Sequence, residues 1–96
     1  MERRFKGTFI LRSRGRYFKV FTTRHLGDDW WTFECKDIES KQNQVFKYQM
    51  LGILEALDSA ASEMKDPKDI LLIDLDNQGK WKIMTKDQID KAMKGH

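Results

Sequence analysis

The six arginines of this chain all lie in its first quarter, and arginine is the side chain best suited to bind phosphate. Residues 1–24 hold eight basic residues and one acid, a charge of +7, whereas residues 25–96 hold ten lysines and fourteen acids, a charge of −4. The guanidinium is a planar fork that pairs with phosphate oxygens and stacks on bases. The stretch Arg12-Ser13-Arg14-Gly15-Arg16 crowds three such groups together, and their repulsion is relieved by a polyanion. This segment therefore predicts a nucleic-acid partner.

Aromatic rings share the same basic segment. Eight of the eleven aromatic residues precede residue 34. Exposed rings stack on bases at about 1–3 kcal/mol each, and cations neutralise phosphates and release counterions. No pattern for reading base edges is visible, so we expect a preference for strandedness rather than for base sequence. The predicted nucleic-acid site consists of Lys6, Arg12, Arg14, Arg16, Tyr17, Lys19, Phe21, Arg24 and Trp30.

Residues that could support catalysis are few. The glycines are isolated and form no phosphate-binding loop. His25 would have to meet Cys35 or a serine through folding, and a polar surface role suits a histidine beside a turn better. The single cysteine cannot form an internal disulfide, and no Cys/His cluster suggests zinc. We expect a protein that is not an enzyme and that holds no metal or cofactor.

Asp74 and Asp76 give the one pattern that points to catalysis. They form a D-x-D pair at the end of an apolar run, a position where metal-dependent nucleases place carboxylates. The simpler interpretation is that Asp76 begins a turn and Asp74 faces solvent. A metal-dependent nuclease is therefore a remote alternative.

Alternating side chains predict a sheet in the first half of the chain. Phe5–Arg12 and Arg16–Arg24 are expected to form a hairpin around a tight turn, and Trp30–Lys36 continues it as a third strand. A polar stretch follows, in which Val45–Tyr48 could add a short fourth strand.

The second half of the chain begins with a helical pattern. Apolar residues repeat at intervals of three and four from about Gln49 to Met64, and Pro67 ends this helix. Ile70–Leu75 and Lys80–Met84 form a second hairpin, and Thr85 with Gln88 has the form of a helical capping box. The predicted fold is α+β, an antiparallel sheet in the order β-β-β-(β)-α-β-β-α, forming a two-layer single domain over residues 1–96.

Side chains alternate across strands, so the choice of a core face fixes what the other face displays. We assign Phe5, Phe9, Leu11, Phe18, Val20, Trp31, Phe33 and Cys35 to the core. The opposite, exposed face would then carry Lys6, Thr8, Ile10, Arg12, Tyr17, Lys19, Phe21 and Trp30. The alternative is a sheet covered on both faces, which would bury Phe21 and Trp30.

Residues 5–64 resemble the PUR-type single-strand nucleic-acid-binding domains, in which a curved antiparallel sheet is followed by one helix. The resemblance lies in Gly15-Arg16-Tyr17-Phe18-Lys19-Val20 as an aromatic strand after a basic turn, and in Asp29-Trp30-Trp31-Thr32-Phe33-Glu34 as the next strand. The second hairpin and helix depart from a simple β-β-β-β-α repeat. The resemblance implies binding of single-stranded DNA or RNA, by one chain or by a homodimer.

The strand and helix order also resembles the first part of a ribonuclease H-type fold. That family needs an aspartate in its first strand and a glutamate early in its first helix. Phe5–Arg12 contains no acid, and the helix opens on Gln49. The resemblance therefore gives no support to catalysis.

The leading hypothesis is a small non-enzymatic protein that binds single-stranded DNA or RNA on a basic, aromatic sheet face. The alternative partner is a host protein, since Arg, Trp and Tyr also dominate protein interfaces, and the chain would then be an inhibitor or adaptor of the kind that phages and mobile elements encode. No apolar run approaches the length of a membrane span, so no membrane partner is expected. The lone cysteine favours a cytoplasmic location.

Overall fold

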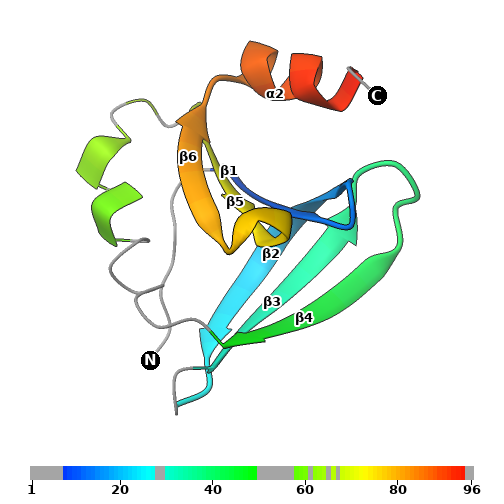
Figure 1. The fold of residues 1–96 in the computed structure, drawn as a ribbon, viewed down its shortest axis with the longest axis vertical. Coiled ribbons are helices and arrows are strands. Elements are labelled where there is room, and N and C mark those ends of the chain that lie inside the picture. The colour runs from blue at the N-terminus through cyan, green and yellow to red at the C-terminus, as the bar shows by residue number, and fades with distance from the viewer. Residues whose placement is uncertain are drawn as a thin grey trace.

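The structure is a computed structural model, and it describes residues 8–27, 30–49, 58–60, 62–64, 66 and 68–94. Six strands form one sheet in the order β4-β3-β2-β1-β5-β6 (Figure 1). A 3₁₀ turn, η1, joins the last two strands, and helix α2 follows them. The elements are β1 (Thr8–Ser13), β2 (Arg16–His25), β3 (Trp30–Asp37), β4 (Asn43–Gln49), β5 (Ile70–Asp74), η1 (Leu75–Asn77), β6 (Lys80–Met84) and α2 (Lys86–Lys94).

The sheet is mixed, which corrects the prediction of an antiparallel one. Strands β1 to β4 form an antiparallel meander and β5–β6 an antiparallel hairpin, but β5 pairs with β1 in parallel, with Phe9 opposite Leu71. A parallel neighbour requires a crossover of a dozen or more residues, and the chain between β4 and β5 is long enough to cross to the far side of β1. The described part of this connection is helical at 58–60 and 62–63. The rest of the helix predicted for 49–64 lies outside the described residues.

Apolar side chains pack on both faces of the sheet, so the two-layer prediction was incomplete. Leu71 and Ile73 point into the larger cluster, whereas Ile70 and Leu72, the alternate residues of β5, point into a second cluster with Ile89 of α2. The larger cluster contains Phe9, Leu11, Phe18, Trp31, Phe33, Cys35 and Ala60, with Val20, Phe46, Tyr48, Met64, Leu75 and Trp81 packed against it. Every described residue assigned to the core from sequence belongs to this cluster, apart from Val20, which is partly buried and packs against it. Phe5 lies outside the described residues.

The second cluster corrects the placement of Ile10. This residue was expected on the exposed face, but it is buried against Ile70, Leu72, Met84 and Ile89. Helix α2 lies over this part of the sheet because its apolar side, which includes Ile89, faces β1, β5 and β6 (Figure 1). The sequence alternation placed Ile10 on the correct face but could not show that a helix from the chain's end covers it.

Local turn and cap chemistry fixes the ends of these elements. The turn between β1 and β2 consists of Arg14 and Gly15, with φ of 54° and 73°, and two positive φ values match the right-handed twist of a tight hairpin. The capping box predicted before α2 is confirmed. The Thr85 amide donates to Gln88 Oε1 at 2.9 Å, and the Gln88 amide donates to Thr85 Oγ1 at 3.2 Å.

Candidate functional site

The face of the sheet that carries α2 extends over strands β2, β3 and β4, where several of the described side chains are exposed. Cross-strand register assigns residues to this part of the face, because residues directly opposite each other share a face. Ile10 is opposite Lys19, and Lys19 is opposite Lys36, so the surface continues outward from the edge of the α2 cluster. We name this surface the open face, and it comprises Lys19, Thr22, Arg24, Trp30, Thr32, Glu34, Lys36, Asn43, Val45 and Lys47.

The open face is strongly basic. Lys19 and Lys36 stand directly opposite each other in the register, and both side chains are exposed. Within the described ranges neither lysine belongs to an ion pair. Arg24 and Lys47 flank Thr32 in a second row, and Glu34 is the one acid of the surface. Like charges placed directly opposite in a sheet are unfavourable, so this pairing is one that an anion would relieve.

A hydroxyl group without a partner lies in the second of these rows. Thr32 Oγ1 is buried and has no hydrogen-bond partner among the described residues. The residues directly opposite Thr32 on its two neighbouring strands are Arg24 and Lys47. A hydroxyl can donate to a phosphate oxygen, so Thr32 Oγ1 is a candidate donor within this row.

Large apolar side chains are exposed at the turn that follows β2 and at a bulge within β2. Trp30 is 41% exposed and, with Leu26, Gly27 and Lys47, lines a pocket of about 290 Å³. Phe21 is 58% exposed and sits at a bulge, where the register shifts between Val20 and Thr22. The bulge interrupts the alternation, so the face of Phe21 does not follow from the pleat. An aromatic ring beside a lysine is suited to stack a base and pair its phosphate.

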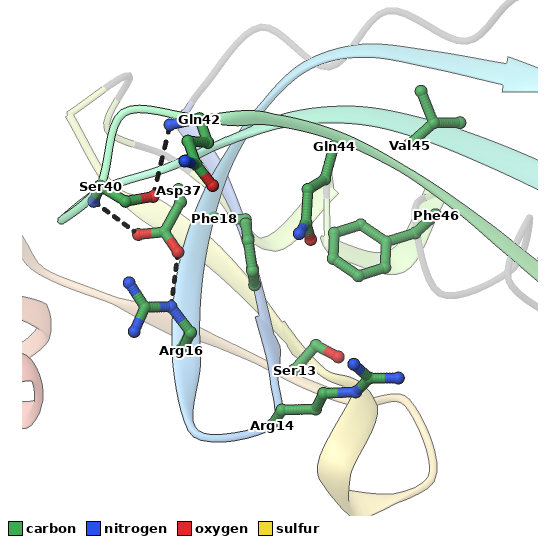
Figure 2. Close-up of a pocket in the computed structure, with 10 residues that line it drawn as sticks. All are labelled: Ser13, Arg14, Arg16, Phe18, Asp37, Ser40, Gln42, Gln44, Val45 and Phe46. Carbon is green, nitrogen blue, oxygen red and sulfur yellow. Dashed lines mark hydrogen bonds and ion pairs between the residues drawn. The ribbon is translucent and has the colours of Figure 1, made fainter.

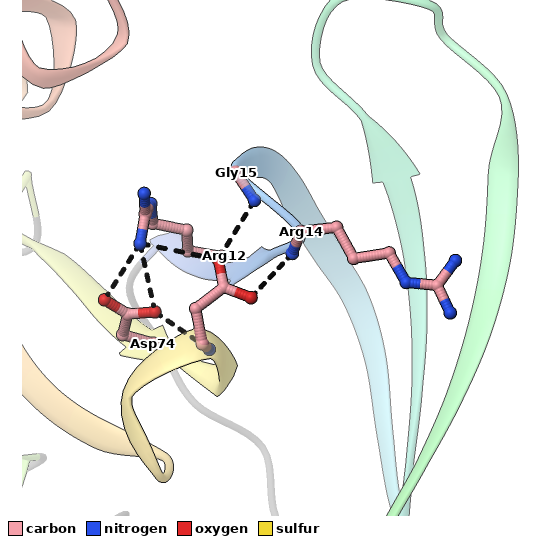
Figure 3. Close-up of polar contacts among 5 residues, drawn as sticks. Arg12, Arg14, Gly15 and Asp74 are labelled. Atoms are coloured by element: carbon pink, nitrogen blue, oxygen red, sulfur yellow. Dashed lines mark hydrogen bonds and ion pairs between the residues drawn. The ribbon is translucent and has the colours of Figure 1, made fainter.

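The predicted residue Arg12 is held in a structural ion-pair cluster. Its Nη1 lies 3.4 Å from an oxygen of Asp74 and 3.4 Å from Asp76 Oδ2 (Figure 3). Its guanidinium also lies 6.0 Å from the ring centroid of Tyr17, which is half-buried against the α2 cluster. Neither Arg12 nor Tyr17 is displayed with the open-face lysines as the sequence had suggested.

Asp76 links two turns that are distant in sequence. It accepts the Arg14 amide at 2.7 Å and the Gly15 amide at 2.9 Å, and these hydrogen bonds, the Gly15 one first, lower the pKa of its carboxyl group. Asp74 in turn accepts the Asp76 amide at 3.0 Å. Both carboxylates of the D-x-D pattern are thus engaged by protein donors. In the part of the chain that the structure describes, no group of three His, Cys, Asp or Glu side chains could hold a metal.

Arg16 is paired with a buried acid at the other side of the hairpin. Its Nε donates to Asp37 Oδ2 at 2.6 Å, and Asp37 also accepts the amides of Glu39 and Ser40. The Arg16 hydrogen bond, with smaller contributions from these amides, lowers the pKa of Asp37 to about 2. Arg16 therefore stabilises the turn that joins β3 to β4.

A pocket of about 660 Å³ lies between the β1–β2 turn and the β3–β4 turn (Figure 2). Phe18 and Phe46 form an apolar wall, with ring centroids 4.9 Å apart in an edge-to-face arrangement. Arg14 and Gln44 belong to the rim. Phe18 and Phe46 contact the larger core cluster, so this pocket is on the face opposite the open face.

The nine predicted site residues therefore occupy several different environments. Lys19, Arg24 and Trp30 lie on the open face, Phe21 lies at its bulge, and Arg14 lies at the pocket on the other face. Arg12, Arg16 and Tyr17 have structural contacts, and Lys6 lies outside the described residues.

Lys36 and Lys47 were missed by the sequence reasoning. They alternate with the inward-facing residues Cys35, which is buried, and Phe46, which is half-buried, so extending the two-residue period into β3 and β4 would have found them.

The thiol of Cys35 is not available for catalysis. The side chain is fully buried, and burial raises the pKa of its thiol to about 12. A buried neutral thiol is a poor nucleophile.

Comparisons with known proteins add no assignment. No protein-family model, no curated protein and no solved structure matches this chain. Among the described residues, no helix has the length and apolar character needed to cross a membrane.

Proposed function

We propose that this chain is a non-enzymatic protein that binds single-stranded DNA or RNA on its open face. The observation that carries the proposal is the exposed Lys19–Lys36 pair, set directly across two strands without an acid partner in the described residues. Repulsion between the two ammonium groups destabilises the free protein, and a bound polyanion would attract both groups.

The spacing of the basic rows favours a chain of phosphates over a single anion. The first row consists of Lys19 and Lys36, and the second of Arg24, Thr32 and Lys47. They cross β3 at Lys36 and Thr32, four residues apart, which corresponds to about 13 Å along a strand. One small anion cannot contact both rows at once. A nucleic-acid backbone that crosses the strands can place successive phosphates near each.

The exposed ring of Trp30 favours a single strand over a duplex. Bases must be unstacked from a partner strand before they can lie on this ring, and single strands offer such bases at little cost. Trp30 lies beside Lys47 at the pocket described above, so one nucleotide could meet a ring and a cation together. The PUR-type resemblance of residues 5–64 is kept within this proposal and leaves monomer and dimer open.

Fluorescence anisotropy with labelled single-stranded DNA, single-stranded RNA and duplex DNA tests the proposal. We expect the single strands to bind more tightly, with affinity falling as salt rises by about 0.7 log units per log unit of salt for each phosphate contact. The double variant Lys19→Gln/Lys36→Gln should weaken binding and reduce this slope by about 1.4.

A matched control removes the same charge elsewhere. Lys86→Gln/Lys91→Gln changes two exposed lysines of α2, and it should leave the slope unchanged. Equal weakening by both double variants would mean that net charge alone attracts the strand, and it would overturn the assignment of the open face.

A protein partner is the second candidate, favoured by the apolar side chains near the same surface. Leu26 is 50% exposed and Val45 is 59% exposed, and neither contributes to binding phosphate. A complex held by such residues would survive nuclease treatment and high salt, whereas a nucleic-acid complex would survive neither.

A further inference from the structure

The Arg14 side chain is placed by a costly backbone conformation. Arg14 has φ of 54°, a left-handed value that asparagine and glycine adopt with less strain than arginine. The Asp76 carboxylate fixes this conformation through the Arg14 and Gly15 amides. Arginine at this position is thus held in place despite its poor fit to the turn, and strain of this kind is typical of functional positions.

The Arg14 guanidinium has no acid partner in the described part of the chain. Figure 3 shows that its side chain extends away from Asp74, although its own amide is bound to the neighbouring Asp76. Figure 2 shows it at the pocket, on the side opposite Gln44 and Phe46. The other arginine of this pocket, Arg16, is neutralised by Asp37 at 2.6 Å. The pocket therefore presents one uncompensated positive charge.

The remaining walls are suited to a flat ring. Phe46 is half-buried and packs edge to face on Phe18, which leaves an apolar surface beside the Arg14 side chain. The side-chain amides of Gln42 and Gln44 line the same pocket, and each offers both donors and an acceptor. A volume of about 660 Å³ is within the range of small-molecule sites.

We propose that this pocket binds a nucleotide, with its phosphate on Arg14 and its base between Phe46 and the glutamine amides. The guanidinium fork matches a phosphate, and the amides match the polar edge of a base. The same chemistry is offered by a free nucleoside monophosphate and by the phosphorylated end of a strand. This site is on the face opposite the open face, so it does not depend on the function proposed above.

Titration of the labelled protein, followed by amide NMR shifts, tests the site. The ligands are the four nucleoside monophosphates, the matching nucleosides, inorganic phosphate, and a trinucleotide with and without a 5′-phosphate. We expect a monophosphate to shift the amides of Arg14 and Gln44, and to bind roughly tenfold or more tightly than its nucleoside or inorganic phosphate. A phosphorylated trinucleotide that binds better than the free nucleotides would identify a strand end as the source.

Arg14→Asn is the informative variant because it removes the guanidinium while keeping a residue that tolerates the left-handed turn. An Asn-Gly turn is the favoured sequence for this geometry, so the variant should fold with an unchanged or raised Tm and lose roughly tenfold or more in nucleotide affinity. Lys41→Asn is the matched control, since Lys41 is an exposed cation with φ of 64° that does not line the pocket.

Two results would overturn the proposal. The first is that nucleotides leave the amide shifts of Arg14 and Gln44 unchanged, and the second is that Arg14→Asn and Lys41→Asn lose nucleotide affinity equally. The variant Lys19→Gln/Lys36→Gln should bind nucleotides normally. The experiments therefore distinguish a lack of strand binding on the open face from a lack of nucleotide binding in this pocket.

Discussion

At the scale of single residues, Asp37 makes the stability of the protein depend on acid pH. Its pKa is about 2 in the folded protein, below the ordinary value of 3.8, chiefly because Arg16 donates a hydrogen bond to it. A depressed pKa stabilises the fold above the unfolded-state value, and this contribution is lost as pH falls from about 4 to about 2.

We expect Asp37→Asn to be less stable than the parent at pH 7. The stability of this variant should also fall less than that of the parent as the pH is lowered from about 4 to about 2. Urea unfolding at pH 7, 4 and 2.5 measures the difference, which should shrink as pH falls. Arg24→Gln is the control, because Arg24 is an exposed arginine of β2 without an ion-pair partner in the described ranges. If the free energies of unfolding of Asp37→Asn and the parent differed by the same amount at all three pH values, the proposed role of this ion pair would be wrong.

At the scale of elements, the β2–β3 pairing holds an unfavourable contact. Lys19 and Lys36 are directly opposite each other, and removing one of two like charges at such a position gains about 0.2–1 kcal/mol. We expect Lys36→Gln to raise the free energy of unfolding at low salt, to lose this advantage at high salt, and to bind single strands less tightly. Urea denaturation at two salt concentrations measures the first two effects. A destabilised Lys36→Gln at low salt would show that the pair does not repel.

The two turns joined by Asp76 provide a second prediction for the elements. Asp76→Ala removes the acceptor of the Arg14 and Gly15 amides, so it should cost about 1 kcal/mol of stability or more, with the β1–β2 turn affected first. Hydrogen exchange of the Gly15 amide should accelerate. Asn77→Ala, an exposed change in the same 3₁₀ turn, is the control. Unchanged exchange at Gly15 would remove Asp76 from this role.

The sequence was most informative where the controlling interactions are local. Alternation identified the inward residues of β1 to β3, and the Thr85–Gln88 spacing identified the start of α2. The parallel pairing of β1 with β5 could not be predicted because periodicity does not reveal which strands are neighbours.

Long-range contacts also explain the errors at the candidate site. Ile10 was wrongly expected to be exposed, because the helix that covers it comes from the other end of the chain. Arg12 and Arg16 looked free in the sequence because their acids are 62 and 21 residues away.

At the scale of the whole molecule, the charge asymmetry of the sequence becomes an asymmetry between surfaces. Two arginines of the basic segment, Arg12 and Arg16, are bound to acids from the rest of the chain, whereas the lysines of β2, β3 and β4 lie exposed on one half of one face. Helix α2 lies over the other half (Figure 1). The open face is the wide basic surface among the described residues. The candidate nucleotide pocket lies on the opposite face.

Amide and indole NMR shift mapping with an unlabelled single strand tests most directly whether the open face binds nucleic acid. We expect the largest shifts at Lys19, Arg24, Lys36 and Lys47 and at the Trp30 indole, with α2 unchanged. The shifts should shrink as salt rises. Shifts confined to α2 and β6, or no shifts at low salt, would contradict the proposed function.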